Sequence, residues 1–439
     1  MAIIPQKTLF DYSEIENLGD LERLLLVIEY LPDEKLMKHL EKERGNGRND
    51  YPIRGMWNSL LAGIVYQHDS VESLRRELAR NGQLRSICGL YNKVPPSWVY
   101  SRFLNKLMED EHKHYIDEIF DTLIEQLQKL LPDFGKRLAV DGKAIESFAN
   151  SHEYDEDNED LKDDRRRDMD ADYGKKVYHW EDEDGNKYKK VKSWFGYKLH
   201  LIVDSSYELP VAFDVAPASK GEEPKAHKLI DKLDKKHPKI LENCKFFSAD
   251  KGYDDGKLSK KLWDEYDIKP VIDIRDMWQG DKTRLLEGTD NVVYDNCANV
   301  YCYDLETGRK REMAYGGFEK DRETLKYRCP AEHYGLKCKG KEKCSLAKSI
   351  RIPISENKRR FTPLARSSYK WDREYDKRTA VERVNSRLDV SYGFENHTIR
   401  GLEKMELQCS LSLIVMLAMA VGRIEEKQKD KMRSLVKTA

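Results

Sequence analysis

Apolar residues recur every three or four positions through the first 135 residues, a spacing typical of amphipathic helices. The stretches LERLLLVIEYL and IRGMWNSLLAGIVYQ carry it clearly, and so does the long segment PPSWVYSRFLNKLMEDEHKHYIDEIFDTLIEQLQKLL, which reads as one continuous helical stretch. Ser70 stands directly before a further periodic stretch, VESLRRELARN, and is expected to cap its helix. The pattern therefore predicts a helical domain over residues 1–135.

After residue 136 the pattern changes to short runs rich in β-branched and aromatic residues. RLAVDGKAI (137–145) reads as one strand, while WFGYKLHLIVD (194–204) and LPVAFDVAPAS (209–219) read as a hairpin. A helix, a strand, a helix and a strand follow up to residue 274. This order predicts an α/β domain, a mixed sheet with helices packed on it, built from residues 136–274 and 364–425.

Two segments interrupt this order, and a third follows it. Residues 149–193 are dominated by Asp, Glu, Lys and Arg, which predicts a charged, flexible insertion. Residues 275–363 combine cysteines with short strand-like runs and are expected to form an inserted Cys-rich subdomain. Residues 426–439 form a charged C-terminal tail.

Composition narrows the class of protein only partly. The 78 basic and 79 acidic side chains give a net charge of -1, which leaves room for strongly basic local patches and so does not exclude nucleic acid. The N-terminal stretch has no signal-peptide pattern. The apolar run LSLIVMLAMAV (411–421) is too short to span a bilayer and is expected to be a buried helix. We expect a cytoplasmic protein without a membrane partner.

Three carboxylates stand at positions where they can converge. Asp141 and Asp250 each follow an apolar strand-like run, where a turn is the ordinary interpretation of either residue alone. Glu382 lies beside the apolar stripe of a helix, where a surface salt bridge to Arg378 is the ordinary interpretation. Side chains at the ends of neighbouring strands project into one crevice. Three carboxylates gathered there would need cations, and their oxygen ligands suit Mg²⁺ or Mn²⁺.

The blocks around these carboxylates carry a resemblance to a known family. LAVDGKAI, SADKGYDD and YDKRTAVERVNSRL, in this order and spacing, resemble the bacterial insertion-sequence DDE transposases. The branch it resembles has a Tyr-x2-Arg-x3-Glu-x6-Lys signature, which Tyr375, Arg378 and Glu382 match. Asp389 stands where that signature has Lys. The stretch from Tyr51 to Leu90 also resembles the helical N-terminal domain of such transposases.

The resemblance implies a ribonuclease-H-like core that cuts DNA at the ends of a mobile element. The freed 3′-hydroxyl would then attack target DNA by transesterification. It implies that Asp141, Asp250 and Glu382 hold two Mg²⁺ or Mn²⁺ ions and that Tyr375 and Arg378 contact phosphates. It further implies double-stranded DNA as partner, a homodimer on paired ends, and a location in the bacterial cytoplasm at the nucleoid. Arg387 and Lys377 are candidates to replace the signature lysine.

Two other functions remain open at this point. A metal-dependent DNA nuclease with the same core would cut without strand transfer. A transposase-derived DNA-binding protein would have lost catalysis, which the intact set of carboxylates disfavours. Both would share the predicted fold.

Two further features bear on metal and DNA. Cys302, Cys329, Cys338 and Cys344, with Cys297 as the alternative to Cys302, offer four thiolates for a structural zinc, while free thiols are an equal alternative. The segment 359–378 is basic with interleaved aromatics, and we expect it to contact DNA through Arg366 and Lys370 among others. The arginines of SLRRELARNGQLR face either DNA or solvent.

Overall fold

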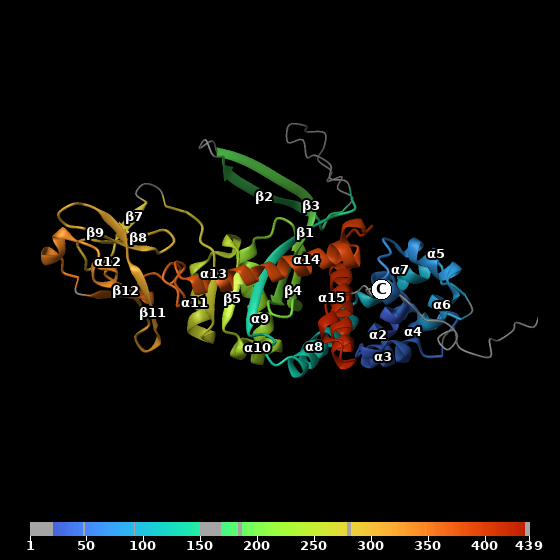
Figure 1. Ribbon diagram of the computed structural model, residues 1–439. Helices are drawn as coiled ribbons and strands as arrows, with labels where there is room; N and C mark the ends of the chain where they lie inside the picture. The colour runs from blue at the N-terminus through green and yellow to red at the C-terminus, as the bar shows by residue number, and fades with distance from the viewer. Residues whose placement is uncertain are drawn as a thin grey trace, which may run out of the picture.

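The N-terminal part of the protein is helical, as the apolar spacing predicts (Figure 1). The computed structural model describes residues 21–46, 49–91, 93–149, 168–182, 187–278, 282–346 and 348–434. The backbone N–H of Ser73 donates to the Ser70 side chain, which confirms Ser70 as a helix N-cap. The helices are α2 (Leu21–Tyr30), α3 (Glu34–Arg44), α4 (Ile53–Val65), α5 (Val71–Arg80), α6 (Gly82–Cys88) and α7 (Ser97–Leu107).

The long stretch expected as one helix is two, α7 and α8 (Asp110–Leu130). Glu109 between them has an extended backbone, and the acidic residues Asp110 and Glu111 favour a new helix N-terminus there. Helix α8 packs along α15 (Leu402–Glu425), and Phe120 contacts Phe213 of the sheet at a ring distance of 5.3 Å. Helix α8 is therefore part of the core, although the apolar spacing assigns it to the N-terminal domain.

The central sheet has the strand order β4-β3-β1-β5-β6. Strand β3 is antiparallel to β1 and β4, while β5 and β6 run parallel to β1 and to each other. This is the ribonuclease-H-like arrangement, so the predicted fold class is confirmed. The strands are β1 (Arg137–Glu146), β3 (Lys187–Asp204), β4 (Leu209–Pro217), β5 (Phe246–Ala249) and β6 (Lys269–Ile272).

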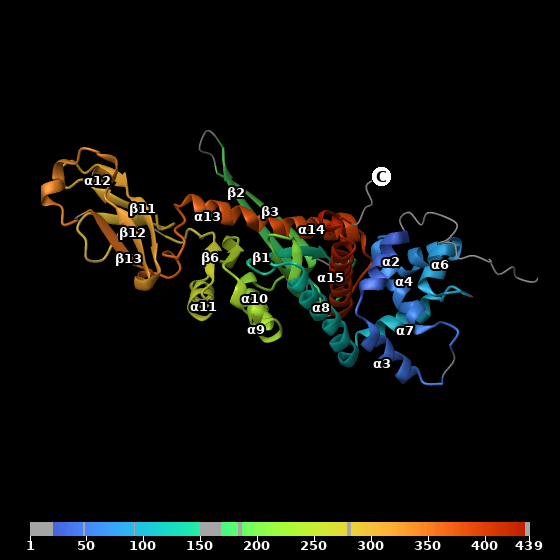
Figure 2. The same ribbon diagram turned by 60° about the horizontal axis from the view of Figure 1, so that its bottom comes forward.

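The outer half of β3 leaves the sheet as one arm of a two-stranded ribbon. It pairs with β2 (Asp172–Glu181) from Asp172 opposite Gly196 to Glu181 opposite Lys187, and Figures 1 and 2 show the ribbon projecting from the core. Residues 172–181 and 187–193 of the stretch predicted as a flexible insertion are strands instead, because strand-favouring Tyr173, Val177 and Val191 stand among the lysines. Residues 150–167 and 183–186 of that insertion lie outside the described residues.

Helices cover both faces of the sheet. Figure 2 shows α14 on one side of β1 and α9 with α10 on the other. The long apolar helix α15 is buried as predicted: it is the one helix of the described residues apolar and long enough for a membrane, and 83% of its apolar window is buried inside the protein. The covering helices are α9 (Glu222–Lys236), α10 (Pro238–Asn243), α11 (Gly256–Tyr266), α13 (Tyr369–Tyr375) and α14 (Thr379–Tyr392).

The inserted subdomain has its own apolar core, which includes Val292, Leu325 and Phe361. It lies beyond α13, at the opposite end of the core from the N-terminal helices (Figure 1). Its elements are β7 (Thr283–Leu285), β8 (Val292–Asp295), β9 (Val300–Tyr303), β10 (Lys310–Glu312), β11 (Ala314–Glu319), β12 (Thr324–Arg328), α12 (Pro330–Tyr334) and β13 (Ser349–Pro353). Short 3₁₀ helices complete the chain: η1 (Lys251–Tyr253), η2 (Lys320–Arg322), η3 (Lys339–Lys343), η4 (Ile354–Glu356), η5 (Asp376–Arg378), η6 (Phe394–Asn396) and η7 (Lys429–Lys431).

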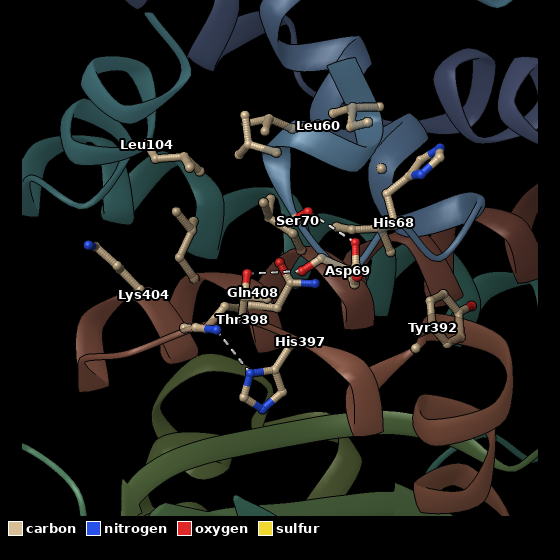
Figure 3. A pocket seen from close by; sticks show the side chains of 18 of the residues that line it. Leu60, His68, Asp69, Ser70, Leu104, Tyr392, His397, Thr398, Lys404 and Gln408 are labelled. Atoms are coloured by element: carbon tan, nitrogen blue, oxygen red, sulfur yellow. Dashed lines mark hydrogen bonds between the residues drawn. The ribbon is translucent and has the colours of Figure 1, made fainter. Parts of the chain in front are cut away.

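A pocket of about 160 Å³ lies where the N-terminal helices meet the core (Figure 3). Leu60, His68 and Ser70 line it from the N-terminal side, and Tyr392 and His397 line it from the core. The Thr398 hydroxyl donates to the backbone oxygen of Asp69 at 3.2 Å and joins the two sides. None of the three predicted carboxylates lines this pocket, so it is not part of the predicted active site. It lies at the joint between the N-terminal helices and the core.

Candidate active site

Asp141 and Asp250 lie where the parallel pairing of β1 with β5 stops; β5 ends there, while β1 continues to Glu146. The pairing of β1 with β5 places Val140 opposite Ala249, and each aspartate is the next residue along its strand. At the carboxyl edge of a parallel pair, both side chains therefore enter the same crevice.

One carboxylate oxygen of each aspartate accepts a hydrogen bond from a nearby backbone N–H. Asp141 Oδ1 accepts from the backbone N–H of Gly142 at 2.8 Å, and Asp250 Oδ1 accepts from Gly252 at 2.8 Å as the N-cap of η1. The second oxygen of each carboxylate has no hydrogen-bond donor among the described residues. The turn interpretation is correct for Asp250 and wrong for Asp141, which lies inside β1, and both carboxylates keep an oxygen able to bind a ligand.

The electrostatics of Asp141 favour a cation nearby. Burial and the charge of Asp250 together raise its pKa to about 6, against the charges of Lys176 and Arg378, which lower it. The ionised carboxylate is therefore unfavourable here without a positive charge beside it. A divalent cation supplies such a charge and takes hard oxygen ligands.

Glu382 reaches the same region from the first turn of α14. Val381, Val384 and Leu388 are fully buried against the sheet, as the apolar stripe predicts. The Glu382 side chain is 50% exposed, and its Oε1 lies 2.7 Å from Nη2 of Arg378. Because Arg378 also acts on the pKa of Asp141, one guanidinium lies between Glu382 and the aspartates. The surface salt bridge expected for Glu382 is present and belongs to the site.

The helix that carries this signature is not continuous. Residues 376–378 form η5, which separates α13 from α14. Tyr375 stacks on Trp371 at a ring distance of 4.6 Å, and the Arg378 guanidinium lies over the Tyr375 ring at 5.6 Å. Tyr375 and Arg378 are thus held together, as the predicted stripe requires, by a 3₁₀ turn instead of an α-helix.

The other predicted DNA contacts divide into two groups. Lys370 is exposed and Lys377 is partly exposed, with its ammonium 2.8 Å from Glu374. The Arg366 guanidinium donates to the backbone oxygens of Ile272, Arg359 and Arg360, and that of Arg387 donates to the backbone oxygen of Glu208. The predicted DNA contact was wrong for Arg366 and Arg387, because these interior bonds hold them away from the surface.

Comparison with known families decides the class of protein. The family described as "Transposase DDE domain" matches residues 134–418, and the family described as "Transposase domain (DUF772)" matches residues 11–106. The chain belongs to the DDE transposase family. It is a DNA transposase, an enzyme that cleaves DNA and transfers strands, and domains of this family use divalent metal ions.

Curated proteins and solved structures add little to this assignment of the transposase. No curated protein matches it. A solved structure described as a piggyBac transposase synaptic complex with hairpin DNA aligns with 96% of this chain and 86% of its own, at 10% identity and a TM-score of 0.35. The assignment to the family therefore rests on the two family matches.

The transposase gathers four of its cysteines in the inserted subdomain. Burial, together with the nearby Cys329, Cys338 and Cys344, raises the pKa of Cys302 to about 11, which places all four thiols in one neighbourhood. Cys297 is instead influenced, after burial, by Asp295 and by Arg366. Of the two sets predicted, the one with Cys302 is the one that the fold brings together.

Two residues near the carboxylates escaped the sequence reasoning. Lys143, two positions after Asp141, forms an ion pair with Asp389 at 2.5 Å. Glu222 is the first residue of α9, which lies on the side of the sheet opposite α14 (Figure 2), and it has an oxygen close to Asp250. An acid at a helix start is common for electrostatic reasons, so the only signal in the sequence was its place a few residues after β4.

Proposed function

We propose that this transposase cleaves DNA by hydrolysis at the ends of its own element and joins the freed 3′-hydroxyl to target DNA by transesterification. Asp141, Asp250 and Glu382 would hold two Mg²⁺ or Mn²⁺ ions. The convergence of Asp141 and Asp250 where the pairing of β1 with β5 stops carries the proposal. Bound there, two cations about 4 Å apart would activate the attacking oxygen and stabilise the leaving one.

The residues present fit such ions. Carboxylate oxygens are the ligands that Mg²⁺ and Mn²⁺ prefer. Asp141 and Asp250 each keep one oxygen free of hydrogen bonds from described residues, and the raised pKa of Asp141 means that a cation would relieve an unfavourable charge. Among the described residues, Glu382 forms an ion pair only with Arg378, so a cation would have to replace this single partner.

Arg378 and Tyr375 would hold the DNA strand at the scissile phosphate. Arg378 is paired with Glu382, so transfer of Glu382 to a cation frees the guanidinium for a phosphate. Guanidinium groups bind phosphate through two parallel hydrogen bonds. Tyr375 keeps Arg378 in place through the ring contact and would add a single hydrogen bond. Lys377 and Lys370 would contact the backbone farther along.

The β2–β3 ribbon would carry the adjoining stretch of duplex DNA. Lys176 and Lys192 are directly opposite each other on its two strands, and Lys176 acts on Asp141 at the site. No ion pair joins five of the ribbon lysines to another described residue, so their charge is available for phosphates. These five are Lys175, Lys176, Lys189, Lys190 and Lys192.

A structural zinc bound by Cys302, Cys329, Cys338 and Cys344 would stabilise the inserted subdomain. A zinc ion takes four thiolates and lowers their pKa values, whereas burial and the neighbouring thiols raise that of Cys302. The amide of Asn291 lies 3.4 Å from Cys344 Sγ and would donate to that thiolate, as groups just outside the ligands of a zinc ion commonly do.

The decisive experiment incubates the purified protein with Mg²⁺ and DNA that carries the ends of its element next to a target plasmid. The intact protein should release the element and join its 3′ ends to the plasmid, and Glu382→Gln should do neither. Glu403→Gln is the matched control, because Glu403 is an exposed acid of α15 far along the chain from the carboxylates.

Cleavage without joined product would favour the metal-dependent nuclease. Binding without cleavage by the intact protein would favour an inactive transposase-derived DNA-binding protein. Equal activity of Glu382→Gln would remove Glu382 from the mechanism. The homodimer on paired ends and the bacterial cytoplasmic location stay predictions, which light scattering of the DNA complex and cell fractionation would test.

A further inference from the structure

Glu222 brings a fourth carboxylate to the edge where Asp141 and Asp250 meet. It is the first residue of α9, and its side chain is 19% exposed. Successive residues of a strand face opposite sides, so Gly142 faces α9 while Asp141 faces the side of α14. Helix α9, which carries Glu222, lies on one face of the sheet, and α14, which carries Glu382, lies on the other (Figure 2).

Two glycines make room for this carboxylate. A Cβ atom on Gly252 would lie 2.1 Å from Oε2 of Glu222 and 2.7 Å from Oδ1 of Asp250. A Cβ atom on Gly142 would lie 3.4 Å from Oε1 of Glu222. Neither glycine has a positive φ, so space for Glu222, and not backbone conformation, explains why no side chain stands there. The Glu222 and Asp250 carboxylates are close neighbours across Gly252.

The two oxygens of Glu222 have different surroundings. Oε1 accepts from the ammonium of Lys198 at 3.3 Å, and the Lys198 side chain is only 9% exposed. Oε2 faces Asp250 and receives no hydrogen bond from another described residue. One oxygen is therefore neutralised inside the protein, while the other lies against a second negative charge.

A buried hydroxyl also lacks a partner at this place. Tyr253 is fully buried, and its Oη atom forms no hydrogen bond in the described structure. Burial raises its pKa, and the charges of Glu222, Asp141 and Asp250 raise it further, so the phenol stands near all three carboxylates as a proton donor. A buried hydroxyl without a hydrogen bond is unfavourable, which points to a bound oxygen atom that accepts a hydrogen bond from Tyr253.

We propose that Glu222 is a fourth acidic residue of the metal site, with Oε2 beside Asp250 as an oxygen ligand for a divalent cation or for its bound water. Lys198 balances the charge on Oε1, and Tyr253 donates to an oxygen held at the same place. The inference rests on the proposed function, since it needs a cation at Asp141 and Asp250.

Metal binding, measured apart from catalysis, tests this role. Calorimetric titration of Mn²⁺ into the full-length protein should give an affinity at least tenfold weaker for Glu222→Gln than for the intact protein. Glu223→Gln is the matched control: it neighbours Glu222 on α9 but pairs with Arg275 on the surface at 3.1 Å. It should leave Mn²⁺ affinity unchanged. If Glu222→Gln fails to fold, Glu222→Asp keeps the charge, withdraws the oxygen and should also weaken Mn²⁺ binding.

Lys198→Met separates a metal role from a simple ion pair. If Glu222 only neutralises Lys198, Glu222→Gln and Lys198→Met should have similar melting temperatures, and both should bind Mn²⁺ as tightly as the intact protein does. That result would overturn the proposal. If Glu222 serves the metal, Lys198→Met should keep or tighten Mn²⁺ binding. Asp141→Asn distinguishes this inference from the proposed function. If Asp141→Asn loses Mn²⁺ affinity and Glu222→Gln does not, only this inference is overturned. If neither variant loses Mn²⁺ affinity, the proposed function is overturned as well.

Discussion

Lys143 of β1 and Asp389 of α14 form an ion pair of 2.5 Å that ties the catalytic strand to the helix of Glu382. Asp389 occupies the position where the resembled signature has a lysine. In this protein a lysine reaches that region from β1 instead, two residues beyond Asp141. Asp389 thus has a structural account: it holds Lys143.

Exchanging the two residues tests this account. Asp389→Asn should lower the free energy of unfolding by about 1–2 kcal/mol, because it leaves a largely buried ammonium without its partner. The double variant Lys143→Asp with Asp389→Lys restores the pair with reversed polarity and should recover most of that loss. Urea unfolding of both single variants and the double variant measures this. A double variant as unstable as the sum of its singles would show that the two residues act independently.

The raised pKa of Asp141 predicts a specific dependence of stability on pH. Its pKa is about 6 in the folded protein and near 3.8 when exposed, so the folded state binds the proton more tightly. This contribution is fully present below pH 4 and is lost as the pH rises through 6. Asp141→Asn should therefore stabilise the metal-free protein at pH 7.5 by on the order of 2 kcal/mol, with no gain near pH 4.

Chemical denaturation at these two pH values, with and without Mg²⁺, measures the effect. Asp204 also has a pKa raised to about 6 by burial, so the comparison uses the difference between Asp141→Asn and the intact protein, in which the Asp204 contribution cancels. Mg²⁺ should stabilise the intact protein at pH 7.5 more than the variant. An equal gain from Asp141→Asn at both pH values would contradict the prediction.

The sequence located Asp141 and Asp250 because each directly follows a short apolar run, LAV or FFSA. The pairing of β1 with β5 then brings the two aspartates together, although β1 continues past Asp141 to Glu146. Glu222 could not be found this way. Its importance depends on Gly142 and Gly252, which become its neighbours only when β1, β5 and α9 assemble.

The predictions that differ from the structure, for two arginines and for the charged insertion, have the same origin. A basic segment predicts DNA contact by composition, but Arg366 and Arg387 turn inward to bond backbone oxygens, which no composition shows. The charged stretch after residue 149 includes the strand β2, in which strand-favouring Tyr173 and Val177 stand on either side of two lysines. In both cases the tertiary pairing, and not the local charge, decides where a side chain lies.

Substitution of ribbon lysines should weaken DNA binding and reduce its dependence on salt. Removing one lysine–phosphate interaction lowers the slope of log affinity against log salt by about 1, so Lys190→Gln with Lys192→Gln should lower it by about 2. Both side chains are exposed and lie on the same face of the ribbon. Filter binding to a duplex over a range of KCl concentrations measures the slope. Lys260→Gln, an exposed lysine of α11, is the control, and an unchanged slope in the double variant would contradict the prediction.

The cysteine cluster predicts a selective loss of zinc. Cys338→Ser removes one of four gathered thiols, and the purified variant should hold less than about a tenth of the zinc of the intact protein, because a site with one ligand missing binds far more weakly. Its inserted subdomain should then be cleaved faster by protease, since metal binding contributes directly to the folding of small domains. Cys297→Ser, at an exposed cysteine outside the cluster, should keep both zinc and protease resistance. Zinc measured by atomic absorption decides between a metal site and free thiols: equal zinc in the two variants, or none in the intact protein, would identify the four cysteines as unligated.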